Sequence, residues 1–257
     1  GMARDYREAK VLDQIEPGKR YLIRFCHGLG DMVMFLPLWR ALQELRPESR
    51  IDLQLFNGQE GLFGSVHNPD PKDYDDVFDI AFLCAEGSGW TKAWRCCVHE
   101  LGIPPIQPLA SLPLCDSPLV AVHFQGTSLP LATNCPEAVA AMIWAEVGSA
   151  GKMPFEVHYL HCWANPANRP YACVTNSARH AAVPAITIPN LIGLLQRCFA
   201  FVGVLSGPAM AALALAPARC LILENRTRLA YYTPTPAATL DVNAYKPGSV
   251  AAWLKSL

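Results

Sequence analysis

The sequence has few charged residues. Asp, Glu, Lys and Arg together make up 17% of its 257 positions, against about a quarter in an average soluble protein. The formal net charge is −1, and Lys and Arg form no cluster. The chain therefore lacks the positive surface with which proteins bind nucleic acids, and we expect no nucleic-acid partner.

Long apolar runs are also missing, although 51% of the residues are hydrophobic. The apolar segments are shorter than the roughly 20 residues of a transmembrane helix. No segment has the pattern of a secretory signal peptide. We therefore expect a cytoplasmic protein whose apolar residues form substantial cores.

Cysteine pairs with metal-binding or redox spacing are absent too. The ten cysteines are scattered through apolar segments without a Cys-x-x-Cys pair, which is typical of reduced core residues. His158 and His161 fall on one predicted strand and would point to opposite faces, which does not suit one zinc ion. The acids between Asp70 and Asp76 lack EF-hand spacing. We expect no metal site.

The most informative segment is residues 21–51. A β-rich run over 21–26 precedes His27-Gly28-Leu29-Gly30, and apolar residues then recur with helical spacing. This pattern predicts a strand, a tight turn and a helix, with Asp31 as the N-cap residue. Pro37 predicts a kink or a restart of that helix. The segment is not the dinucleotide fingerprint, because the third glycine is absent.

The second half of the chain repeats the strand and glycine-loop pattern. A predicted strand over 119–124 precedes Gln125-Gly126-Thr127-Ser128, and another over 199–205 precedes Ser206-Gly207-Pro208. We expect Ser206 to cap the following helix, with Pro208 in its first turn. The start of a helix after a parallel strand is a plausible pyrophosphate site.

The remaining pattern alternates strands and helices. Short apolar runs predict the other elements: strands over 51–56, 77–84, 155–161, 171–175 and 219–224, and helices over 5–15, 90–101, 136–147, 188–198 and 250–257. The Pro-rich segment 103–118 predicts a connector. The sequence thus predicts an α/β protein with two Rossmann-like domains facing a cleft, residues 1–116 and 117–257.

Two blocks resemble glycosyltransferase family 9, the heptosyltransferases of the lipopolysaccharide inner core: GLGDMVMFLPLWRALQELRPESRIDL and IPNLIGLLQRCFAFVGVLSGPAMAALALAPARCLILE. The resemblance implies the GT-B architecture and an inverting, metal-independent transfer of a sugar. The donor is a nucleoside diphosphate sugar, ADP-linked in the heptosyltransferases, and the acceptor is a glycan. No cofactor is implied.

The same resemblance assigns roles to residues of this chain. Asp31 matches the family's catalytic base, within the acceptor-side loop His27, Gly28, Leu29 and Gly30. The C-terminal domain would bind the donor through residues that follow its strands: Gln125, Gly126, Thr127, Ser128, Ser206, Gly207, Pro208 and Glu224.

Three segments depart from the family pattern. The family's Asp-Ser-Gly-Pro-x-His reads Leu205-Ser-Gly-Pro-Ala-Met210 here, its Lys-Arg-Trp corresponds to Thr133-Asn134-Cys135, and its Phe-Gly corresponds to Glu224-Asn225. Each charged hydrogen bond lost from the donor contributes roughly 1.5 to 3 kcal/mol.

Two hypotheses therefore stand. The chain is a family 9 type glycosyltransferase with altered donor choice, or a non-catalytic member that binds a sugar nucleotide, a glycan or a protein in the cleft. The sugar-nucleotide epimerases share the architecture, but their acidic and histidine residues are not found. A lipid-linked acceptor would place the protein at the inner face of the cytoplasmic membrane, although no strongly basic amphipathic helix supports this. The sequence does not predict the oligomeric state.

Overall fold

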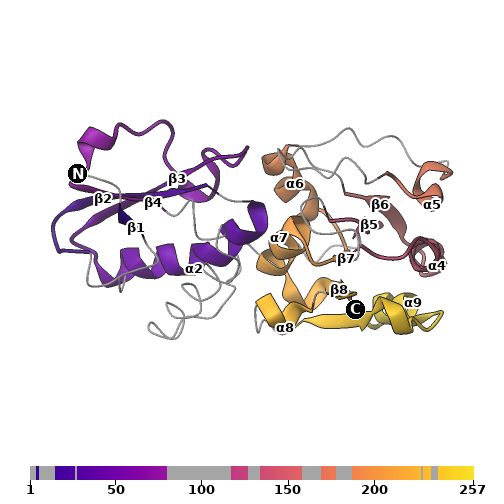
Figure 1. Cartoon of the computed structure of the whole chain (residues 1–257). Coiled ribbons are helices and arrows are strands. Elements are labelled where there is room, and N and C mark those ends of the chain that lie inside the picture. The colour runs from indigo at the N-terminus through magenta and orange to yellow at the C-terminus, as the bar shows by residue number, and fades with distance from the viewer. Residues whose placement is uncertain are drawn as a thin grey trace. The chain divides into compact units, whose positions relative to one another are not determined.

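The computed structural model describes most of the chain, namely residues 4–5, 15–26, 28–79, 117–126, 134–157, 169–177, 187–226, 228–232 and 237–257. The chain divides into two compact units, 1–107 and 108–257, and each contains one parallel β-sheet (Figure 1). The predicted helix over 90–101 and the predicted boundary at residue 116 lie outside the described residues. The α/β fold with two Rossmann-like sheets is confirmed.

The sheet of the first unit has four parallel strands in the order β1-β4-β2-β3. Its elements are β1 (Arg4–Asp5), β2 (Arg20–Phe25), α2 (Leu29–Leu45), β3 (Arg50–Leu55) and β4 (Asp76–Asp79), with 3₁₀ turns at Leu62–Gly64 and Pro71–Asp73. Helix α2 connects the parallel neighbours β2 and β3, as a βαβ unit requires. The predicted strands over 21–26 and 51–56 are thus present within one residue at each end.

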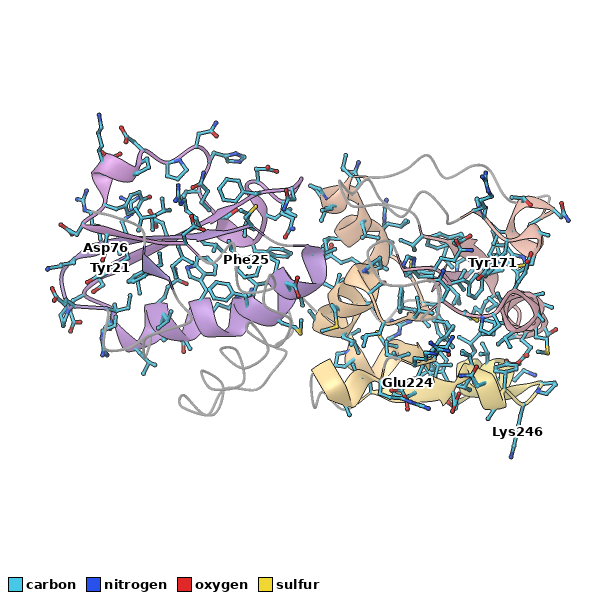
Figure 2. The ribbon with its side chains drawn as sticks, viewed as in Figure 1. Tyr21, Phe25, Asp76, Tyr171, Glu224 and Lys246 are labelled. Carbon is cyan, nitrogen blue, oxygen red and sulfur yellow. The ribbon has the colours of Figure 1, made fainter. Side chains whose placement is uncertain are left out.

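Helix α2 lies along one face of this sheet (Figure 1). Figure 2 shows Phe25 between the sheet and the helix, where its ring stacks on Phe35. The indole N–H of Trp39 donates a hydrogen bond of 3.2 Å to the carbonyl of Ile51. This buried bond satisfies the polar atom of a large aromatic residue and fixes the helix against β3.

The outer edge of β3 is covered by the chain that follows it. The amide of Val66 donates to the carbonyl of Leu53 at 2.8 Å. The segment between them turns through left-handed conformations at several residues: Asn57, Gly58, Gly61, Phe63 and Gly64. This folded loop protects an edge strand that would otherwise expose unpaired backbone groups.

The sheet of the second unit has five parallel strands in the order β6-β5-β7-β8-β9. The elements are β5 (Leu119–His123), α4 (Glu137–Ser149), β6 (Met153–Glu156), α5 (Ala172–Thr175), α6 (Ile188–Leu195), β7 (Ala200–Val204), α7 (Gly207–Leu215), β8 (Cys220–Glu224), α8 (Leu229–Tyr232), β9 (Ala238–Asp241) and α9 (Ser249–Ser256), with 3₁₀ turns at Pro217–Arg219 and Val242–Ala244. Counted within the unit, the order is 2-1-3-4-5, the doubly wound order of flavodoxin-like proteins.

Helices cover both faces of the second sheet. Residues of α4 and α9 form one core with inward residues of β5, β7 and β8, while α6 and α7 lie on the other side of the strands (Figure 1). Strands β7 and β8 are buried at every position. Burial on both faces explains why β7 is apolar throughout and β8 is apolar up to its last residue, Glu224.

Some predicted elements were wrong. Residues 172–175 form the helical turn α5 and not a strand, with Tyr171 as the N-cap residue, because Glu137 Oε1 accepts the amide of Ala172 and the Tyr171 hydroxyl donates to the carbonyl of Cys135. These tertiary contacts outweigh the β propensity of Tyr, Val and Thr. Asp5 lies in β1 and not in a helix, while 6–14 are outside the described residues. Strand β9 and helix α8 were missed.

The prediction that the cysteines lie in the core is confirmed for three of the five described ones. Cys135, Cys198 and Cys220 are buried, whereas Cys26 and Cys173 are partly exposed, and all five are free thiols. Among the described residues, no helix has both the length and the apolar character needed to cross a membrane.

Candidate functional site

The first candidate site is the turn between β2 and α2. In the order β4-β2-β3, the chain moves from β2 to one side and later crosses to the other, so the carboxyl end of β2 is a topological switch point. Ligands of open α/β sheets bind in the crevice at such points. Gly28, Leu29, Gly30 and Asp31 lie here, and His27 is outside the described residues.

The prediction that Asp31 caps the helix was wrong. Helix α2 begins at Leu29, its N-cap residue is Gly28, and Asp31 is the third helical residue. The amide of Met32 donates to the Gly28 carbonyl at 3.1 Å, which closes the first turn. Asp31 is partly exposed in this turn, where the helix dipole favours a negative charge.

Helix α2 passes Pro37 without an interruption. The helix therefore does not restart at Pro37, and the expected kink stays a prediction. Proline removes only one main-chain donor, and 17 residues of helix with a buried face supply enough packing to continue past it. The first turn with Asp31 and the body of α2 thus form one helical segment.

A residue that sequence reasoning missed lies beside this turn. The side-chain amide of Asn57, just after β3, donates to the Cys26 sulfur at 3.7 Å, and Asn57 has a φ of 59°. Asparagine adopts this left-handed conformation more readily than most residues. The Asn57-Gly58 pair directly after a strand was the available signal, since Asn-Gly marks a tight turn. The loops after β2 and β3 are thus joined at the carboxyl edge of the sheet.

The second candidate site is the switch point of the second unit, between β5 and β7. Gln125 and Gly126 follow β5, and Ser206, Gly207 and Pro208 follow β7. The topology thus brings these five predicted donor-site residues to the crevice that doubly wound sheets use for ligands. Thr127 and Ser128 lie outside the described residues.

The residues after β5 are held by hydrogen bonds. Gln125 is 7% exposed, and its side-chain nitrogen donates to the carbonyl of Arg169 at 2.9 Å. The amide of Gly126 donates to Asn134 Oδ1, also at 2.9 Å. Burial of Tyr171, whose ring lies 6.3 Å from that of Phe124, raises the pKa of its hydroxyl. Hydrogen bonds of Gln125 and Gly126 thus hold this wall of the crevice.

The residues after β7 begin a buried helix. Ser206 is the N-cap residue of α7, but its side chain makes no capping hydrogen bond and its hydroxyl is 3.5 Å from the Val204 carbonyl. The prediction of a capping side chain was wrong, although the residue stands at the predicted place. Pro208 is the second helical residue and has no amide hydrogen. The amide donors of this first turn belong to Gly207 and Ala209.

Glu224, the last residue of β8, is 8% exposed and binds within the chain. Its Oε2 accepts the amide of Leu229 at 2.7 Å, and its Oε1 lies 3.6 Å from a guanidinium nitrogen of Arg228. Arg228 also donates to Asp241 Oδ2 at 3.1 Å. The amide of Asn243 and then Arg228 lower the pKa of Asp241. Figure 2 places Glu224 in the second unit, and its donor role stays a prediction.

The departures at 205 and 210 are apolar positions of the core. Leu205 is 4% and Met210 is 3% exposed. Within the described ranges, no group of three or more His, Cys, Asp or Glu side chains is placed to hold a metal ion.

Comparison with solved structures identifies the fold. The chain is similar to TibC from enterotoxigenic E. coli H10407, a bacterial iron-containing dodecameric glycosyltransferase, with a TM-score of 0.62 and 14% identity over 90% of this chain and 66% of that one. It is similar to E. coli ADP-heptose LPS heptosyltransferase II, with a TM-score of 0.60 and 13% identity over 92% of this chain and 98% of that one. A family 9 glycosyl transferase from Veillonella parvula DSM 2008 has a TM-score of 0.58 and 13% identity over 95% and 97%.

The match to TibC covers 90% of this chain, and this chain spans about two thirds of the length of TibC. Neither a family model nor a curated protein matches the sequence. These findings define the fold of the chain, which is the two-sheet α/β fold of GT-B-type heptosyltransferases of glycosyltransferase family 9. The predicted fold resemblance is therefore confirmed.

Proposed function

We propose that this protein transfers a sugar from a nucleoside diphosphate sugar to a hydroxyl group of a glycan. The observation that carries the proposal is the position of its two glycine-containing turns. In a heptosyltransferase fold, each lies at the switch point of its own sheet, and the first of them carries Asp31. The N-terminal unit would bind the acceptor and the C-terminal unit the donor.

The proposed donor is an ADP-linked, heptose-like sugar. E. coli heptosyltransferase WaaC has been solved with ADP and with ADP-2-deoxy-2-fluoro heptose, and TibC in complex with ADP-D-beta-D-heptose. The amides of Gly207 and Ala209 at the start of α7 would face the diphosphate, since helix N-termini favour anions. The acceptor would be a glycan such as the lipopolysaccharide core, and a lipid-linked one would bring the protein to the inner membrane surface.

In the proposed reaction, an acceptor hydroxyl oxygen forms a bond to the anomeric carbon while the bond from that carbon to the diphosphate oxygen breaks. Asp31 takes the proton of the hydroxyl, and the nucleoside diphosphate leaves with the electron pair. Displacement from the opposite side inverts the configuration. A carboxylate orients the hydroxyl and accepts its proton as the new bond forms. No metal or cofactor takes part in this scheme.

The test has a binding step and a transfer step. Calorimetric titration with ADP, UDP, GDP and CMP, followed by sugar conjugates of the nucleotide that binds, identifies the donor class. Asp31→Asn should then lower transfer at least about 100-fold, the lower range of general-base contributions, with nucleotide affinity within twofold. Glu44→Ala is the matched control, because Glu44 is an exposed acid of the same helix. Equal turnover of Asp31→Asn and wild type would remove Asp31 as the base.

A second candidate is a non-catalytic protein that binds a sugar nucleotide, a glycan or a protein at these sites. The observation that favours it is the apolar and buried state of Leu205 and Met210, where the family resemblance implies an acid and a histidine. Micromolar nucleotide binding without transfer to any glycan would favour this candidate over the enzyme.

A further inference from the structure

Three asparagines form a hydrogen-bonded chain at the carboxyl edge of the second sheet. Asn225 Nδ2 donates to the carbonyl oxygen of Asn134 at 2.9 Å. Asn243 Nδ2 donates to Asn225 Oδ1, also at 2.9 Å. Asn134 Oδ1 in turn accepts the amide of Gly126. These three hydrogen bonds therefore connect the loops that follow β5, β8 and β9.

The hydrogen-bonded asparagines cross the candidate donor site. In the sheet, β7 lies between β5 and β8. A hydrogen bond from Asn225, just after β8, to Asn134, just before α4, therefore spans the carboxyl end of β7, where Ser206 and Gly207 begin α7. It fixes the distance between the two loops on either side of that end.

The bonds leave the Asn225 amide with one orientation. Its nitrogen is a donor to a carbonyl and its oxygen is an acceptor from an amide, so the partners define which atom is which. Asn134 is 8% exposed and uses both its side-chain and its main-chain oxygen. A satisfied polar network of this kind rigidifies its surroundings, whereas a partly satisfied one would be costly.

The two bonded residues stand at positions where the sequence departs from the family 9 pattern. Asn134 lies in the segment that corresponds to Lys-Arg-Trp, and Asn225 in the pair that corresponds to Phe-Gly. They are 91 residues apart and bind each other. The bond uses the main-chain carbonyl of Asn134, while the Asn134 side chain separately accepts the amide of Gly126.

We propose that Asn225 is a positioning residue of the donor site. By holding the Asn134 carbonyl, it keeps Gly126 and the start of α4 at a fixed place beside the start of α7. The inference rests on the proposed function, because the ligand it positions is the sugar nucleotide.

The test compares Asn225→Ala with Asn243→Ala. Both remove an amide without changing charge, but only the first breaks the bond to Asn134, and Asn243→Ala removes the outer bond alone. We expect Asn225→Ala to raise the Kd of the nucleotide that binds best by about tenfold, the effect of one hydrogen bond. Asn243→Ala should change it less than twofold. The melting temperatures of the two variants test whether a loss of stability causes the change in Kd.

A second readout needs no ligand. Hydrogen exchange of the Gly126 amide, followed by NMR, should be faster in Asn225→Ala and unchanged in Asn243→Ala. Equal changes of Kd in both variants, or unchanged exchange of Gly126 in Asn225→Ala, would overturn the inference. If wild type binds none of the four nucleotides, the proposed function fails while the exchange result still decides whether Asn225 holds the loop. Asn225→Ser replaces Asn225→Ala if the latter does not fold.

Discussion

Phe35, in the second turn of α2, stacks on Phe25, the last residue of β2, with ring centroids 4.8 Å apart and ring planes inclined by 15°. The turn that carries Gly28 and Asp31 lies between them in sequence. Because the ring pair joins the end of the strand to the helix, it restricts movement of the first turn of α2 along the sheet. Packing of two core residues thus determines where Asp31 is held.

Replacement of Phe35 by Ala should lower the free energy of unfolding by about 3 to 5 kcal/mol, the usual cost of removing a buried aromatic ring. Phe35 is 3% exposed, so the cavity cannot be filled by water without further loss. Urea denaturation followed by circular dichroism measures the change. Leu45→Ala is the control, since Leu45 is 46% exposed in the same helix. A loss in Phe35→Ala no larger than in the control would contradict the packing argument.

Gly203 is required in β7 by the side chains around it. A Cβ at this position would lie 2.7 Å from the ring of Phe201 and 2.9 Å from the Cβ of His123. Gly203→Ala should therefore lower the free energy of unfolding by about 1 to 3 kcal/mol through overpacking. Gly193→Ala in α6 is the matched control, because nothing lies within 4 Å of its Cβ. Alanine should stabilise that helix by up to about 1 kcal/mol. Thermal unfolding that shifts in the same direction for both would refute this reading of Gly203.

Much of the fold could be predicted from the sequence, because the apolar runs of parallel strands and the glycines after them are local signals. The turn before Asp31 and the turn at Ser206 were placed at the correct ends of their strands. What depends on tertiary contacts was not predicted. The helical turn at residues 172–175 depends on hydrogen bonds to Glu137 and Cys135. The hydrogen bond between Asn225 and Asn134 joins positions 91 residues apart.

Cap positions were also poorly predicted. Asp31 is a residue type that favours the N-cap position, yet α2 begins two residues before it, at Leu29, with Gly28 in an extended conformation as the N-cap residue and Gly30 inside the helix. Helix ends depend on packing of the first turn as well as on the residue type. Asp31 and Ser206 were therefore predicted in the right turns, whereas the side-chain caps predicted for them were wrong.

Tyr74 predicts a pH dependence at the edge of the first sheet. Its hydroxyl donates to Asp52 Oδ2 at 2.7 Å. Burial and then this hydrogen bond raise the pKa of Tyr74 to about 12. Between pH 10, the ordinary pKa of tyrosine, and about 12, the unfolded chain loses this proton while the folded chain keeps it. The stability that Tyr74 contributes is therefore complete below pH 10 and falls as the pH rises toward 12.

Tyr74→Phe lacks both the bond and the titrating group. At pH 7 it should be less stable than wild type by about 1.5 kcal/mol, the lower range for a hydrogen bond to a charged group. The difference should narrow between pH 10 and 12, as measured by urea denaturation of both proteins at a series of pH values. A difference that stays constant over this interval would show that Tyr74 keeps no raised pKa.

Glu146 of α4 caps helix α9 from a distance in sequence. Its Oε1 accepts the amides of Val250 and Ala251 at 3.1 and 3.2 Å, and its Oε2 accepts the hydroxyl of Tyr245 at 2.6 Å. The N-cap residue of α9, Gly248, has no side chain to perform this role. A carboxylate at this helix start is favoured both by the two amides and by the helix dipole.

Glu146→Ala should therefore cost about 1.5 to 3 kcal/mol of unfolding free energy, and the amides of Val250 and Ala251 should exchange faster. Glu146→Gln keeps an oxygen acceptor and should lose only about 0.3 to 1 kcal/mol from the dipole interaction. Tyr245→Phe removes one bond but leaves the cap, so it should leave the exchange of these two amides unchanged. Hydrogen exchange in the three variants separates capping from simple packing, since loss of packing alone would accelerate α9 equally in Glu146→Ala and Tyr245→Phe.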